Sequence, residues 1–211
     1  MDVNDLQTGD ILLFSDYETG IFDYFLSMIR WATHSEYVHV GMIVKDPPFA
    51  DHLKGIFVWE SGYEGTPDPE DGEIKLGVQL TPIETMFENM SATRSVIFVR
   101  RLSKPEVFTS EVLSKIHSET YNKPYDLNLL DWFQALFGKD RDPQKTGRFW
   151  CSAFIGFIFT CAGIIDENTD WSIMRPCDFA VDGENLDYAS QDCMLLPWEK
   201  VLKKDWINYL D

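Results

Sequence analysis

An uncharged and strongly apolar segment constrains this chain more than any other feature. Residues 149–165 read FWCSAFIGFIFTCAGII, which is close to the lower length limit for a membrane-spanning helix. Ser152, Gly156, Thr160 and Gly163 dilute the segment, and such a mixture is typical of a helix that is buried on all sides in a folded core. We therefore expect a central buried helix and no integral membrane span.

The composition of the whole chain supports a folded core around this helix. Of 211 residues, 45% are hydrophobic and 14% are aromatic, far from the composition that keeps a chain disordered. The length suits one well-filled core and is short for two average domains. We expect a single domain over residues 1–211.

Charge restricts the partners of the protein. The chain has 35 acidic and 18 basic residues and a formal charge of −17. Such a field repels phosphate backbones and anionic membrane surfaces, whereas it leaves neutral or cationic substrates unhindered. We expect no nucleic-acid partner, and the sequence gives no indication of the oligomeric state.

Cysteine usage and the first residues indicate the compartment. The four cysteines form no C-x-x-C pair, and all of them lie in the last third of the chain, unlike the cysteines of a secreted disulfide scaffold. The start MDVNDLQTGD has neither the basic residues nor the apolar run of a signal peptide. We therefore expect a cytoplasmic protein.

Short β-branched and aromatic runs predict a sheet in the first half of the chain. The loop expected at residues 64–73 is exposed and rich in Pro, Gly and Asp. We expect an α+β fold in which a small, largely antiparallel sheet packs against helices. The expected strands are residues 10–14, 38–44, 56–60, 78–80 and 96–101.

Apolar residues at helical spacing predict several helices in addition to the one at residues 149–165. Residues 166–195 are polar and without periodicity, which predicts irregular structure. The further helices are expected at residues 20–32, 105–121, 126–137 and 197–203.

Cys151 is the strongest candidate for a nucleophile. It follows a Thr-Gly-Arg turn and begins the uncharged segment, so its sulfur should lie in the first turn of the helix. Unpaired N–H groups and the positive end of the helix dipole stabilise a thiolate there, the form that attacks carbonyl carbon. Most free cysteines are simply buried, and we expect this role for Cys161, Cys177 and Cys193.

His39 and Glu60 lie on two neighbouring predicted strands. A hairpin that places His39 opposite Glu60 also places Val44 opposite Gly55, and it would let the carboxylate orient and stabilise the imidazole. Strand alternation puts His39 and Gly41 on one face, where the glycine leaves space beside the histidine. The other face of the strand should carry four apolar side chains, those of Val38, Val40, Met42 and Val44.

A second histidine precedes this strand. His34 and His39 have a spacing that suggests a metal pair, but no carboxylate or cysteine completes a ligand set. We expect neither a metal nor another cofactor.

Several short motifs occur in a characteristic order. They are GDILLF at residues 9–14, SEYVHVGMIV at 35–44, FVWE at 57–60, KPYDLN at 123–128 and FWCSAFI at 149–155. This order resembles the circularly permuted papain-like superfamily, and within it the NlpC-related, YiiX-type proteins of bacteria and their viral relatives, including poxvirus members. In that family the histidine strand precedes the cysteine helix.

The resemblance implies a papain-like α+β fold and a Cys-His-Glu catalytic triad formed by Cys151, His39 and Glu60. A family tyrosine that lines the site and assists the oxyanion would match Tyr125. The related lecithin:retinol acyltransferase group has another histidine as the third polar residue, so Glu60 favours the YiiX-type branch.

These features together predict a cysteine peptidase or amidase that cleaves an amide bond through a Cys151 acyl-enzyme. Its substrate would be a peptide, an amino-acid amide or an acyl lipid. One alternative is a lipid-directed hydrolase or acyltransferase, because aromatic residues that could accept an acyl chain occur at Phe133, Phe137, Phe149 and Trp150. The other is a non-enzymatic binding or structural protein on the same fold.

Overall fold

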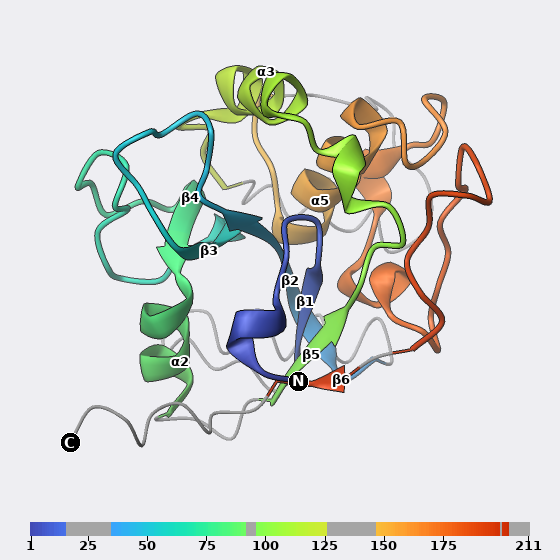
Figure 1. Ribbon diagram of the computed structural model, residues 1–211, viewed down its shortest axis with the longest axis horizontal. Helices are drawn as coiled ribbons and strands as arrows, with labels where there is room; N and C mark the ends of the chain where they lie inside the picture. Colours follow the sequence, from blue (N-terminus) through green and yellow to red (C-terminus); the bar gives the residue numbers. More distant parts are fainter. Residues whose placement is uncertain (16–34, 92–95, 126–146, 199, 203–211) are drawn as a thin grey trace.

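The computed structural model describes residues 1–15, 35–91, 96–125, 147–198 and 200–202 (Figure 1). Within these ranges the chain is an α+β protein with one six-stranded antiparallel sheet, of order β4-β3-β2-β1-β5-β6, and three α-helices. The helices are α2 (Ile83–Ser91), α3 (Ser110–Thr120) and α5 (Cys151–Cys161). The strands are β1 (Ile11–Ser15), β2 (Tyr37–Lys45), β3 (Ile56–Gly62), β4 (Gly77–Pro82), β5 (Val96–Arg100) and β6 (Lys200–Val201).

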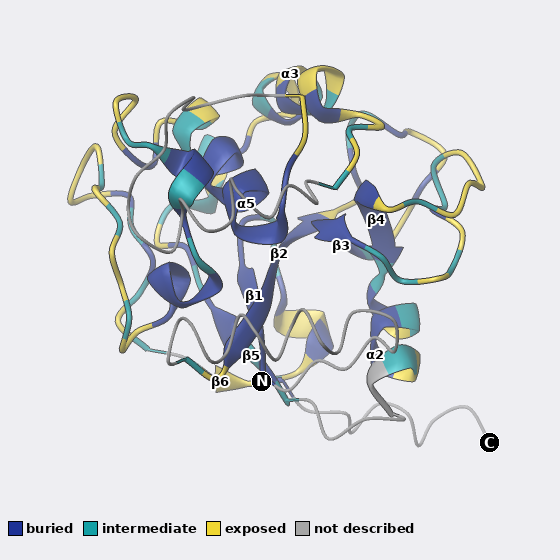
Figure 2. Cartoon of the chain, turned by 180° about the vertical axis from the view of Figure 1, so that it is seen from behind, coloured by how far each residue is buried: buried dark blue, intermediate teal, exposed yellow. Residues whose placement is uncertain are grey.

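The sheet confirms the strands that the sequence predicts. β1 and β2 lie at its centre and are buried along almost their whole length, as the dark strands of Figure 2 show. The β-branched and aromatic residues of these strands pack well on a pleated surface that is covered on both faces. The predicted small antiparallel sheet is therefore correct.

The predicted register of the β2–β3 hairpin is wrong by two residues. Val44 pairs with Phe57 and Lys45 with Ile56, so Val44 does not lie opposite Gly55. The hairpin closes later than expected, because Asp46 N donates to Gly55 O and Gly55 N donates to Asp46 Oδ1, both at 2.8 Å. A shift of two keeps the paired residues of this hairpin on their predicted faces.

Helix α5 confirms the expected buried helix, although it begins at Cys151 and ends at Cys161, inside the predicted range 149–165. All its residues from Cys151 to Phe159 are buried. It packs against β2, β3 and the 3-10 helix Trp171–Ile173, with α3 beyond it (Figure 1). None of the helices within the described ranges is long and apolar enough to cross a membrane.

Two apolar clusters cover the two faces of the sheet. The first joins Val40, Met42 and Val44 of β2 to α5, and the second joins Ile43 to α2. Val38 belongs to the second cluster and not, as alternation predicts, to the first. The β1–β2 register shifts between Phe14 and Ser15, and such an irregularity interrupts the alternation of side chains.

Two of the other predicted helices differ in the structure, and two fall outside the described residues. The predicted helix 105–121 is interrupted: Pro105–Val107 is a 3-10 helix, and α3 starts after Thr109, whose side chain caps it by accepting from Val112 N at 3.3 Å. The helix predicted at 197–203 is wrong where the structure describes that range, since Lys200–Val201 pairs with β5 as β6. The predicted helices 20–32 and 126–137 lie outside the described residues.

The loop at residues 64–73 is confirmed as a loop but is not wholly exposed. Asp68 is buried and accepts hydrogen bonds from Lys75 Nζ at 2.8 Å and from Leu80 N at 3.2 Å. A buried carboxylate needs such partners. The loop is thereby tied to β4.

Residues 166–195 are largely irregular, as predicted, with two short 3-10 helices at Trp171–Ile173 and Pro176–Phe179. Arg100 holds this region to the sheet. Its buried guanidinium donates to Phe179 O and Leu196 O, each at 3.0 Å, and pairs with Glu184. Backbone carbonyls that no helix or sheet satisfies thus receive charged donors.

Candidate active site

The segment that leads into α5 is fixed from several sides. Ser61 Oγ donates to Phe149 O at 2.7 Å, and Phe149 N donates to Pro124 O at 3.2 Å. The two neighbours of Cys151 share one acceptor: Trp150 Nε1 and Ser152 Oγ both donate to Met174 O, at 3.2 and 2.6 Å. These bonds hold the first turn of the helix in place.

Cys151 is the first residue of α5, as the sequence predicts, and its side chain is buried. Trp150 is the N-cap residue, and its side chain makes no capping hydrogen bond to the helix. The first N–H groups of a helix have no partner within the helix. The sulfur therefore lies at a turn where backbone donors and the helix dipole favour a negative charge.

His39 and Glu60 form a short, buried hydrogen bond. His39 Nε2 donates to Glu60 Oε2 at 2.6 Å, with the histidine 6% and the glutamate 0% exposed. The predicted pair is thus present in the structure, although the hairpin register assumed for it is not. The shift of two residues makes the pair diagonal, and both side chains still project from the same face.

The pair forms where two strand ladders diverge. The β2–β3 ladder ends at Met42 and Trp59. Beyond it, β2 continues along β1, with His39 opposite Phe14, while β3 continues along β4, with Glu60 opposite Gln79. The imidazole and the carboxylate therefore meet across the point at which the two strands separate.

Glycines make this meeting possible. A Cβ atom on Gly62 would lie 3.3 Å from His39 Cε1, so a larger residue would crowd the ring. Gly41, which we expected to leave space beside His39, instead admits a side chain of β3: its Cβ would lie 2.6 Å from Val58 Cγ1. Gly62 is a site residue that the sequence reasoning missed, because nothing local shows which residue faces the ring.

Cys151 and His39 interact directly. Burial disfavours the charged imidazole, but a hydrogen bond with Cys151 and attraction to its thiolate, together with the bond to Glu60, raise the pKa of His39 well above its usual range. Since Nε2 is bonded to Glu60, Nδ1 is the ring nitrogen that remains for the sulfur. The structure thus brings together all three residues of the predicted triad.

The other three cysteines have different surroundings. All four cysteines are free, but burial raises the pKa of the thiols of Cys177 and Cys193, and it raises that of Cys161 to about 11. At neutral pH these thiols are protonated and poor nucleophiles. Cys177 and Cys193 are buried, as expected, whereas the expectation of a buried thiol is wrong for Cys161, which is exposed at the end of α5.

Tyr125 is placed by its backbone next to the nucleophile segment. It forms a parallel bridge with Phe149, two residues before Cys151, and its N–H donates to Leu76 O at 3.0 Å. Its side chain is half-buried and packs on the core around α5. A role of its hydroxyl at the oxyanion stays a prediction. His34 lies outside the described residues.

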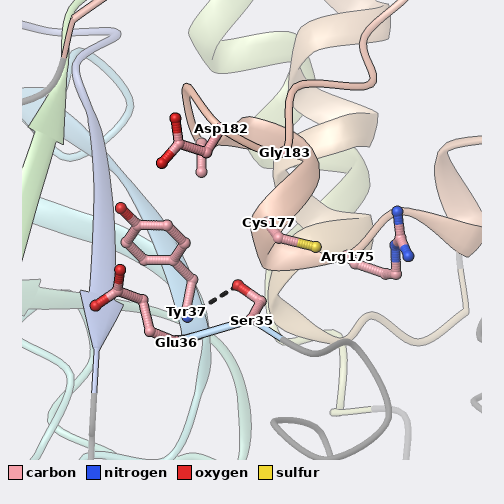
Figure 3. Close-up of a pocket in the computed structure, with 8 residues that line it drawn as sticks. Ser35, Glu36, Tyr37, Arg175, Cys177, Asp182 and Gly183 are labelled. Atoms are coloured by element: carbon pink, nitrogen blue, oxygen red, sulfur yellow. Dashed lines mark hydrogen bonds between the residues drawn. The ribbon is translucent and has the colours of Figure 1, made fainter.

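A cavity of about 380 Å³ lies between the start of β2 and the 3-10 helix Pro176–Phe179, and its lining includes none of Cys151, His39 and Glu60 (Figure 3). Two of its residues are near parts of the site in sequence. Tyr37 is two residues before His39, and Arg175 directly follows Met174, whose carbonyl oxygen accepts hydrogen bonds from Trp150 and Ser152. The Arg175 guanidinium is paired with Asp178 at 2.6 Å. The cavity is lined by Ser35, Glu36, Tyr37, Arg175, Cys177, Ala180, Asp182 and Gly183.

Polar groups dominate the lining of this cavity. Figure 3 shows the Tyr37 hydroxyl between the carboxylates of Glu36 and Asp182, with Arg175 on the far side of Cys177. Because Asp178 already balances the charge of Arg175, the carboxylates set the local sign. Such a lining suits a polar, neutral or cationic group.

Comparison with known proteins adds no family assignment. No family model matches the chain, and no curated protein matches it in sequence.

Proposed function

We propose that the protein is a cysteine hydrolase of the amidase or peptidase type, on a circularly permuted papain-like fold. The observation that carries the proposal is the contact of Cys151, at the start of a buried helix, with a histidine whose other nitrogen is bonded to Glu60. A nucleophile, a base and an orienting group in this order form the arrangement that activates a thiol.

The proposed reaction starts from a thiolate–imidazolium pair. The Cys151 thiolate attacks the carbonyl carbon of an amide, and the backbone N–H of Cys151 meets the developing oxyanion. The His39 imidazolium gives its proton to the leaving nitrogen as the C–N bond breaks, which leaves a thioester on Cys151. His39 then takes a proton from water, whose oxygen attacks the thioester and releases the acid and the thiolate.

Glu60 supports the histidine in both half-reactions. Its carboxylate accepts from Nε2, so Nδ1 faces the sulfur, and its negative charge stabilises the imidazolium. The raised pKa of His39 favours the protonated ring that the first step uses. The permuted order of the chain, with His39 and Glu60 on strands before the Cys151 helix, is the order of the family that the motifs resemble.

The packing of the aromatic residues near Cys151 favours an amide or peptide substrate over an acyl chain. The lipid alternative depends on aromatic residues that could accept an acyl chain. Phe149 is instead 0% exposed and packs inside the core against Phe154, Phe157 and Trp171. Trp150 is 8% exposed, and Phe133 and Phe137 lie outside the described residues.

Trapping of the acyl-enzyme tests the proposal. The protein is incubated with a library of N-acyl amides and short peptides, quenched in acid and analysed by intact mass. We expect an added acyl mass on Cys151, which His39→Ala abolishes. Cys161→Ala is the matched control, because Cys161 is an exposed thiol at the other end of the same helix, and it should behave like the wild type.

Two results would contradict the proposal. One is full turnover by Cys151→Ala on a verified substrate. The other is equal labelling of all four cysteines by an acylating probe, as expected for a non-enzymatic protein. Acylation by long-chain lipid esters in place of amides would favour the lipid-directed alternative.

A further inference from the structure

The Glu60 carboxylate is fixed at both of its oxygens. Oε2 accepts from His39 Nε2 at 2.6 Å, and Oε1 accepts from Thr81 Oγ1 at 2.7 Å. Glu60 is 0% and Thr81 2% exposed. Hydrogen bonds to an ionised oxygen at such distances are roughly twice as strong as neutral ones. The triad therefore continues by one further bond, onto β4.

The second bond matters because a glutamate side chain is long and rotates. A carboxylate held at one oxygen only can turn about its terminal bonds, and a buried one has no solvent to satisfy the other oxygen. The hydrogen bond from Thr81 to Oε1 restricts rotation of the carboxylate, and Oε2 therefore stays directed at the imidazole. Threonine suits this task, since its β-branched side chain is stiff.

The neighbouring polar residue does not provide this bond. Gln79 lies directly opposite Glu60 in the β3–β4 ladder and is 2% exposed. Its Nε2 nevertheless makes no hydrogen bond within the described part of the chain. Thr81, two residues further along β4 and opposite Val58, projects from the same face and reaches Oε1.

We propose that Thr81 is a positioning residue of the site, which acts through Glu60 to hold the His39 ring in its reactive orientation. The inference rests on the proposed function and extends it from three residues to four: Cys151, His39, Glu60 and Thr81. Thr81 has no contact with the reacting atoms in this scheme. It sets the direction of the carboxylate.

Three variants of the full-length protein test the inference. Thr81→Val keeps the shape of the side chain and removes the hydroxyl, whereas Thr81→Ser keeps the hydroxyl. Thr120→Val is the matched control: Thr120 is 0% exposed and its hydroxyl donates only within α3, to Ile116 O at 2.9 Å. The readouts are the titration of the labelled His39 imidazole by NMR, and kcat and KM on the amide found by acyl trapping.

We expect Thr81→Val to move the His39 midpoint to lower pH and to lower kcat about tenfold, the effect of one lost hydrogen bond at the site, with little change in KM. Thr81→Ser and Thr120→Val should match the wild type in both readouts. If Thr81→Val does not fold, Thr81→Ala takes its place in the comparison.

An unchanged His39 midpoint in Thr81→Val, or a Thr81→Ser variant as impaired as Thr81→Val, would overturn the inference. The two proposals fail in different ways. A wild-type protein that cleaves no amide overturns the proposed function, whereas the His39 titration still decides whether Thr81 positions the ring through Glu60.

Discussion

At Gly41 a single methyl group should disturb the strands that carry the site. It lies on β2 two residues after His39, and its Cβ would come within 2.6 Å of Val58 Cγ1 and 3.5 Å of Glu60 Cβ. Carbon atoms in contact are normally about 3.5–4.0 Å apart, so Gly41→Ala overlaps Val58 by roughly 1 Å. Val58 is 0% exposed and has little room to yield.

The cost follows from overpacking. An extra methyl group in a well-packed core costs about 1–3 kcal/mol, and Val58→Ala alone costs about 2 kcal/mol through two lost buried methyl groups. In the double variant the new methyl group occupies the space that Val58 Cγ1 leaves. We therefore expect a double variant about as stable as Val58→Ala, with a coupling energy of about 1–3 kcal/mol between the two positions, equal to the cost of Gly41→Ala alone.

Urea unfolding of the two single variants and the double variant measures this coupling, with midpoints compared at constant m-value. Gly147→Ala is the control, because nothing lies within 4 Å of a Cβ at Gly147, and it should change stability by less than about 1 kcal/mol. Strictly additive costs for Gly41→Ala and Val58→Ala would refute the reasoning, since they would mean that the two side chains do not meet.

Three further predictions concern pH, thiol reactivity and the anchor of α5. Because the pKa of His39 is raised in the folded state, the stability that its paired imidazolium contributes is fully present below about pH 6.5. This contribution is lost as pH rises through the folded pKa. Urea unfolding measured at a series of pH values should show the loss, and His39→Gln should not show it. Alkylation of Cys161, whose thiol has a pKa of about 11, should rise about tenfold per pH unit from pH 7 to 10, and a plateau in that range, seen by peptide mass spectrometry, would contradict its assignment as an unreactive thiol. Ser61→Ala removes the 2.7 Å bond to Phe149 O and should lower the free energy of unfolding by about 1–3 kcal/mol; a change below about 0.5 kcal/mol would show that the bond does not anchor the helix.

The sequence by itself determined the features that depend on local pattern. The strands that carry His39 and Glu60 follow from β-branched and aromatic runs, and α5 follows from an uncharged apolar segment after a turn. The position of Cys151 at the first residue of the helix follows in the same way. Each of these depends on residues that are close together in the chain, where periodicity and turn chemistry act directly.

The tertiary structure decided how these elements meet. The β2–β3 register differs by two residues from the predicted one, because the hairpin closes through bonds between Asp46 and Gly55. The predicted partner of His39 still survived, since a shift of two preserves the face of a strand and Glu60 is long enough to reach the imidazole diagonally.

Gly62 and Thr81 show what no local pattern could reveal. A glycine at the end of a strand and a threonine within a strand are ordinary in sequence, and their roles arise only where β2 and β3 separate and β4 lies beside β3. Such contacts join residues more than 20 positions apart. They depend on ladder register and on the packing of whole elements, which the full set of long-range contacts determines together.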